Sequence, residues 1–154
     1  MPYFGPMSVN PVTNPQSRPL EKWKAASLPG WQPLPVVLLR NQTGLGLSAT
    51  DMLVLVNVLS YWWYADQKPF VRVTTIAKRM GVDVRTVQRS IRKLVEKGLL
   101  ERRKESRGSN GDEREILDPE GLVQVLGLLA EDDFDYPSAR QRETSADGLA
   151  RTAP

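Results

Sequence analysis

The chain has 154 residues, 40% of them hydrophobic, and a formal net charge of +3, which predicts one modest domain with tails. Cysteine and histidine are absent, so disulfides, thiolate metal sites and the commonest metal ligand and general base are excluded. We therefore expect no cofactor, no metal and no enzymatic activity.

Residues 1–32 are rich in Pro, Ser, Asn and Gln and show no persistent apolar period. Such a segment buries too little surface to offset its ordering entropy, so we expect a flexible N-terminal arm. Its aromatic residues either anchor the arm on a partner or on the domain, or belong to an unattached tail. The arm lacks the features of a signal peptide, and the apolar run at 53–64 is too short for a membrane span. We expect a cytoplasmic protein without membrane contact.

Two apolar segments follow the arm. Residues 35–39 (PVVLL) predict a strand or a packed extended segment. Ser48 and Asp51 resemble a capping box, and residues 48–64 predict a helix that is apolar around most of its circumference. Such a helix must be covered by its own domain or by another subunit. In the second case a dimer contact would include Trp62, Trp63 and Tyr64.

Residues 74–98 indicate two helices joined by a short turn. Thr74 or Thr75 is expected as the N-cap of the first helix, and Gly81 as its end. Asp83 is expected to cap the second helix, which Gly98 ends. One apolar stripe of the second helix is formed by Val87, Ile91, Leu94 and Val95.

The other faces of this second helix are polar and strongly basic. They carry Arg85, Gln88, Arg89, Arg92 and Lys93. Such side chains reach base edges or phosphates when a helix lies in the major groove. Basic helix surfaces are often merely solvated. The concentration of bases in the N-terminal half of the second helix favours DNA contact.

Residues 99–118 predict a β-hairpin with a tip at residues 108–111. Leu99 is expected to pack inward, whereas the basic side chains point toward a DNA backbone or minor groove: Arg102, Arg103, Lys104 and Arg107. The alternative is an ordinary surface loop. Residues 72–107 hold 12 basic and 4 acidic side chains, which predicts DNA binding that weakens steeply with salt.

Asp118 and Pro119 predict the start of a last helix with one apolar face, formed by Leu122, Val125, Leu126 and Leu129. We expect this helix to pack on the domain, and a homodimer through it is possible. Residues 132–154 are expected to be a disordered acidic and polar tail. The acids at 131–135 keep the tail soluble, screen the basic face or compete with DNA.

The run TTIAKRMGVDVRTVQRSIRKLVEKGLLERR resembles bacterial winged-helix families, including GntR-like regulators. It is equally similar to the helix-turn-helix domains of plasmid and phage replication proteins, in which a segment like ILDPEGLVQVLGLLAED follows the wing. The resemblance covers residues 33–131 and implies a winged helix-turn-helix fold, mainly α with a small β-wing. It also implies DNA contacts by Arg85, Thr86, Gln88 and Arg89. Many relatives carry Ser or Thr and then Arg or Lys where this chain has Asp83 and Val84.

These features predict a sequence-specific protein that binds double-stranded DNA, either a small transcription regulator or a replication or maintenance factor of a bacterium, plasmid or phage. Arg85 and Gln88 would read base edges, and Arg89 a base or a phosphate. Further DNA contacts are expected from Thr74, Thr75, Lys78, Arg92, Lys93, Arg102, Lys104 and Arg107. The alternative is a protein-interaction module on a winged-helix scaffold. A nucleic-acid-processing enzyme is disfavoured, because no paired carboxylates lie within the basic region.

Overall fold

The computed structural model describes residues 17–107 and 109–133, with only the backbone of Ser17, Arg18 and Arg107. Residues 17–33 and 34–133 belong to two separate units. In the first unit, α1 (Ser17–Trp23) is followed by a 3-10 helix (Lys24–Ser27). The expected flexible arm therefore holds helical structure over residues 17–27, because Pro19 lies in the first turn of α1, where a missing N–H is tolerated. Residues 1–16 lie outside the described part, as do residues 134–154.

The second unit begins with α2 (Val36–Arg40), so the expectation of a strand or extended segment here is wrong. The N–H of Leu38 donates to the carbonyl of Pro35 at 3.0 Å, and the Asn41 side-chain amide donates to the carbonyl of Val37 at 2.8 Å. Five residues are too few for periodicity to separate strand from helix, whereas proline is well suited to a helix start. Leu38 is fully buried and anchors α2 on the core.

Helix α3 (Ala49–Leu59) begins with the capping box that the sequence predicts. The N–H of Asp51 donates to the Ser48 hydroxyl at 3.1 Å, and the N–H of Ser48 donates to the Asp51 carboxylate at 3.0 Å. The helix ends at Leu59 rather than at Tyr64, because the N–H of Trp62 closes a turn on the carbonyl of Leu59. The apolar residues continue beyond the end of the helix, and for this reason the predicted end at Tyr64 is too late.

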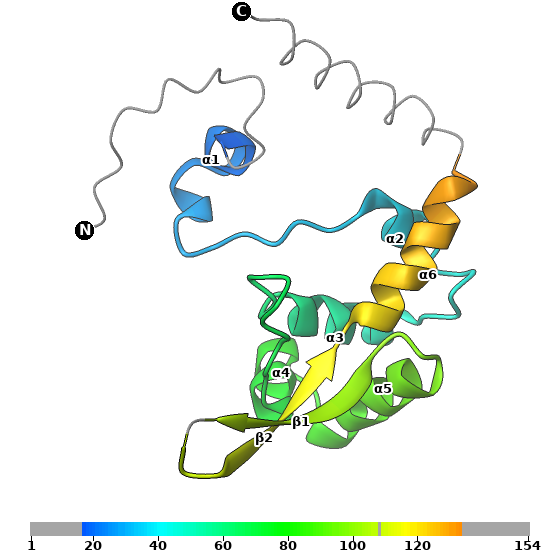
Figure 1. Ribbon diagram of the computed structural model, residues 1–154. Helices are drawn as coiled ribbons and strands as arrows, with labels where there is room; N and C mark the ends of the chain where they lie inside the picture. Colours follow the sequence, from blue (N-terminus) through cyan, green and yellow to red (C-terminus); the bar gives the residue numbers. More distant parts are fainter. Residues whose placement is uncertain (1–16, 108, 134–154) are drawn as a thin grey trace, which may run out of the picture. The chain divides into compact units, whose positions relative to one another are not determined.

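Helices α4 (Val73–Met80) and α5 (Val84–Glu96) form the predicted pair (Figure 1). The N-cap of α4 is Arg72 and no side chain caps this helix, so the expectation of a threonine cap at Thr74 or Thr75 is wrong. The turn is as predicted: Gly81 adopts φ 66°, in the left-handed region that glycine tolerates. The Asp83 carboxylate accepts a hydrogen bond from the N–H of Arg85 at 2.7 Å.

The predicted hairpin is present as β1 (Glu101–Arg107) and β2 (Asp112–Asp118), which pair antiparallel. Glu101 lies opposite Asp118 at the base, and Leu99 is buried beneath it, as expected. The N–H of Leu117 donates to the carbonyl of Pro69 at 3.0 Å. The segment that precedes α4 therefore lies along β2, which ties the base of the wing to the helix pair.

Helix α6 (Glu120–Glu131) leaves the wing directly, because the Asp118 carboxylate accepts a hydrogen bond from the N–H of Glu120 at 2.9 Å. Leu122 and Leu126 are buried, which confirms that this helix packs on the domain. A Cβ on Gly121 would lie 1.9 Å from the carbonyl oxygen of Gly98, so the start of α6 touches the backbone after α5. Farther along, α6 packs beside α2 (Figure 1).

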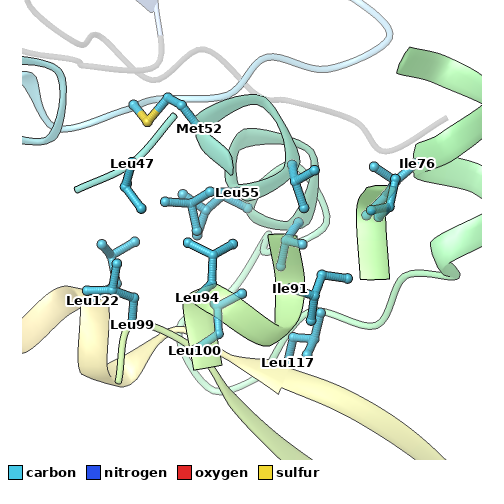
Figure 2. Packing of buried hydrophobic residues seen from close by; sticks show 14 of the residues in the cluster. Leu47, Met52, Leu55, Ile76, Ile91, Leu94, Leu99, Leu100, Leu117 and Leu122 are labelled. Atoms are coloured by element: carbon cyan, nitrogen blue, oxygen red, sulfur yellow. The ribbon is translucent and has the colours of Figure 1, made fainter. Parts of the chain in front are cut away.

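The core is a single cluster to which α3, α4, α5, the wing and α6 all contribute (Figure 2). Its fully or nearly fully buried members include Leu55, Ile76, Ile91, Leu94 and Leu117. Each such side chain contributes about 1.5–3 kcal/mol of burial free energy. Helix α3 is thus covered by its own domain through α4 and α5. The architecture is a winged helix-turn-helix, and none of its described helices has the length and apolarity needed to cross a bilayer.

Candidate nucleic-acid interface

Helix α5 has a buried face and an exposed face, and the exposed face is the candidate interface. Val87, Ser90, Ile91 and Leu94 are buried. The exposed side chains of residues 84–92 lie three or four residues apart and so form one stripe along the helix: Arg85, Gln88, Arg89 and Arg92. The exposed acid Glu96 follows one turn later, at the end of α5. We call these four residues the α5 stripe. Thr86, which the resemblance added to the site, is half-buried beside it.

The guanidinium groups of the α5 stripe form no ion pair within the described part of the chain, although ion pairs are frequent elsewhere in the domain. Asp83, the acid nearest in sequence, has its carboxylate engaged by the N–H of Arg85. A carboxylate at a helix N-terminus is stabilised by the helix dipole. The departure from the family pattern at Asp83 is thus explained as a cap, and Arg85, Arg89 and Arg92 keep their charge available to an anionic partner.

Lys93 lies outside the stripe and is held from within the protein. Its ammonium donates to the Asp51 carboxylate at 2.6 Å, and the hydroxyl of Ser90 donates to the same carboxylate at 2.9 Å. Asp51 is 4% exposed and also accepts from the backbone of Ser48. The ammonium of Lys93 is thus engaged within the domain, which gives this side chain a structural role. A DNA contact by Lys93 stays a prediction.

The pKa of Asp51 reports the balance of forces in this network. Burial of the carboxyl acts to raise its pKa, but hydrogen bonds from Lys93, Ser48 and Ser90 outweigh burial and lower the pKa to about 2. The carboxylate is therefore charged at neutral pH. It joins the N-terminus of α3 to the inner face of α5, which fixes the rotation of α5 about its own axis.

Sequence reasoning missed Asp51 and Ser90 as residues that position the site. One signal was available, because Ser90 is a polar residue within the apolar stripe of α5 and a buried hydroxyl requires a hydrogen-bond partner. The identity of that partner was hidden, since Asp51 lies 39 residues earlier in the chain.

Helix α4 offers a second row of polar groups beside the turn. Thr74 and Lys78 are exposed and Thr75 is half-buried. Neither threonine is used as a helix cap. In a helix-turn-helix the first helix crosses the DNA backbone, so these groups are suited to contact phosphates.

The wing is not the cationic arm that its β1 sequence suggested. Its two strands together hold five basic and six acidic residues, and most basic side chains pair with an acid. Arg102 pairs with Glu115 at 2.5 Å and Lys104 with Glu113 at 3.7 Å. The remaining pairs join Arg114 to Glu105 and Arg103 to both Glu101 and Asp118. The side chain of Arg107 and residue 108 at the tip lie outside the described residues.

The pairing also affects the pKa of Arg103. Its pKa is raised from the usual value, first by the hydrogen bond to Glu101 and then by the charges of Glu101 and Asp118. Of α5 and the wing, α5 is therefore the element that combines positive charge with unpaired guanidinium groups. Among the described residues, no group of three or more acidic side chains is arranged to hold a metal ion.

Residues 45–100 match the model of a helix-turn-helix domain family. The crystal structure of the N-terminal domain of the DnaD protein from Geobacillus kaustophilus HTA426 is similar, with a TM-score of 0.51 and 21% identity, covering 82% of this chain and 96% of that chain. A possible transcriptional regulator from Methanosarcina mazei Go1 matches with a TM-score of 0.40 and 22% identity, covering 66% of this chain and 82% of that chain. None of the curated proteins matches. The predicted winged helix-turn-helix fold is confirmed.

Proposed function

We propose that this protein binds double-stranded DNA in a sequence-specific manner with α5 in the major groove, because residues 45–100 match the model of a helix-turn-helix domain family. The observation that carries the proposal is the α5 stripe, an exposed row of guanidinium and amide groups that form no ion pair with any described residue. Arg85 and Gln88 read base edges, and Arg89 reads a base or a phosphate. No catalytic group is required.

The phosphate contacts in this proposal come from elements that flank the stripe. Thr74, Thr75 and Lys78 approach the backbone from α4, and Arg92 from the far end of the stripe. Arg107 reaches from the wing, and Arg102 and Lys104 contribute only where a phosphate displaces their acidic partners. The pairing across the wing therefore predicts that α5 supplies most of the salt-dependent affinity.

We further propose that the protein acts in the cytoplasm as a transcription regulator or as a replication or maintenance factor of a bacterium, plasmid or phage. Selection of bound fragments from the encoding replicon or chromosome separates these roles. Sites at promoters indicate regulation, and sites at an origin indicate replication. Two inverted half-sites about 10 bp apart would indicate a dimer, and a single half-site a monomer.

The test of the DNA-reading role is the affinity of the selected duplex for Arg85→Ala/Arg89→Ala. We expect a loss of about 2–6 kcal/mol, because each guanidinium that reads a base contributes about 1–3 kcal/mol. The matched control is Lys22→Ala/Lys97→Ala, which removes the same charge from two exposed positions outside the stripe. Equal losses in both variants would refute the assignment, since they would show that only net charge matters.

A further inference from the structure

The segment between α3 and α4 exposes aromatic side chains that the proposed duplex contacts do not use. It contains Tyr61, Trp62, Trp63, Tyr64 and Phe70. Trp63 is 64% exposed and Tyr64 is 66% exposed, although burial of aromatic rings is strongly favourable. We call residues 61–64 together with Phe70 the aromatic segment.

The backbone that carries these rings is ordered by hydrogen bonds. The N–H of Tyr61 donates to the carbonyl of Val58 at 3.1 Å, and the N–H of Gln67 donates to the carbonyl of Tyr64 at 3.1 Å. Tyr64 and Gln67 also form an isolated antiparallel bridge. Trp63 and Tyr64 are thus presented to solvent from a folded turn, so little ordering entropy remains to oppose the binding of a ligand.

Cations lie against three rings of the aromatic segment. The guanidinium of Arg79 lies 5.1 Å from the ring of Tyr61, and the ammonium of Lys68 lies 5.2 Å from the ring of Trp62. Arg114 lies 5.3 Å from the ring of Phe70. Within the described part of the chain, Arg79 and the nearby Arg72 take part in no ion pair. Lys68 pairs with Asp118 and Glu120, and Arg114 pairs with Glu105, so Arg72 and Arg79 are the cations that remain for a ligand. In the sequence between α3 and α4 the single acid is Asp66.

This combination fits a polyanion with exposed flat rings better than it fits a protein partner. A hydrophobic protein surface seated on Trp63 would have to desolvate the neighbouring cations, which is costly without paired charges. A single nucleic-acid strand brings phosphates for the cations and bases that stack on the aromatic rings. A duplex does not fit, because its bases are already stacked on one another.

We propose that the aromatic segment binds single-stranded nucleic acid, with bases stacked on Trp63 and Tyr64 and phosphates held by Arg72 and Arg79. The site shares no residue with the α5 stripe, so in this proposal the protein has one set of side chains for a duplex and another for an unpaired strand. Such an arrangement suits a protein that acts where a duplex is opened.

The test is the affinity of a fluorescently labelled oligothymidylate at low salt, measured by anisotropy for the full chain. We expect Trp63→Ala/Tyr64→Ala to weaken binding by at least about tenfold, since each stacked base contributes substantially. Trp23→Ala is the matched control, because Trp23 is 60% exposed and has the ammonium of Lys22 5.6 Å from its ring. The control should bind as the wild type does.

Two further ligands separate stacking from charge attraction. An abasic strand of equal length should bind the wild type and Trp63→Ala/Tyr64→Ala equally weakly, because only its phosphates remain. The duplex identified by fragment selection should bind Trp63→Ala/Tyr64→Ala as tightly as it binds the wild type. Arg85→Ala/Arg89→Ala should lose affinity for this duplex and retain its affinity for oligothymidylate. If Arg85→Ala/Arg89→Ala bound the duplex as tightly as the wild type does, the result would count against the proposed function. It would not bear on the single-strand site.

Three outcomes would overturn the single-strand site. Oligothymidylate could bind the wild type and Trp63→Ala/Tyr64→Ala equally, or the abasic strand could bind the wild type as tightly as oligothymidylate does. Alternatively, light scattering could show that the double substitution turns an oligomer into a monomer without changing oligothymidylate affinity. That last result would assign the aromatic segment to a protein contact.

Discussion

Asp51→Asn tests whether a buried carboxylate fixes the orientation of α5. The substitution keeps the size of the side chain but removes the charge that binds the Lys93 ammonium at 2.6 Å. It also weakens the capping box of α3 and the hydrogen bond from Ser90, since a neutral amide oxygen is a poorer acceptor than a carboxylate. We expect a less stable fold and a looser attachment of α5 to α3.

The magnitude follows from the pKa of Asp51, which folding lowers from 3.8 to about 2. Each tenfold change in acid dissociation corresponds to about 1.4 kcal/mol, so the charged form contributes about 2 kcal/mol to stability at pH 7. Because the pKa is lower in the folded state, this contribution is complete above about pH 4 to 5. It is lost as the pH falls toward 2, where the carboxyl is protonated in the folded state as well.

Urea unfolding followed by tryptophan fluorescence at several pH values between 7 and 2 measures this difference. The free energy of unfolding of Asp51→Asn should lie about 2 kcal/mol below that of the wild type at pH 7, and the two should converge at the acid end. Asp66→Asn is the control, because Asp66 is exposed and forms no ion pair among the described residues. A deficit that stays constant with pH would refute the reasoning, since it would reflect shape rather than charge.

Three further results are expected from single substitutions. Gly121→Ala should destabilise the fold by about 1–3 kcal/mol, because its Cβ would lie 1.9 Å from the Gly98 carbonyl oxygen. Gly127→Ala, in the same helix with nothing within 4 Å of the new Cβ, should instead stabilise by about 0.5–1 kcal/mol, and thermal unfolding distinguishes them. Arg92→Ala should reduce the slope of log affinity against log salt for the selected duplex by about 1 without changing stability. An unchanged slope would remove Arg92 from the phosphate contacts.

The helix pair and the wing could be predicted from the sequence because local residues specify their ends. Gly81 is required where the chain turns with positive φ, Asp83 caps the next helix, and Gly98 ends it. The apolar stripe of α5 is long enough for its period to identify both the helix and its buried face. The exposed residues Arg85 and Arg89 follow from that face by geometry alone.

Other features depend on contacts that no local pattern shows. The five residues of α2 are too few to display a period, and α3 ends at Leu59 although the apolar residues continue. The pairing of Lys93 with Asp51 spans 42 residues and requires the packed fold. The acids of β2 neutralise the bases of β1 only in the observed register, so the wing looked more basic in sequence than it is in space.

The absence of cysteine allows a direct test of the central claim that the α5 stripe lies in the major groove. An iron chelate that cleaves DNA can be attached to Gln88→Cys, or to Gln124→Cys on the exposed surface of α6 as a control. With the selected duplex bound, the chelate at position 88 should cut both strands within the site, and the chelate at position 124 should cut little or not at all. Cleavage from position 124 with none from position 88 would contradict the account.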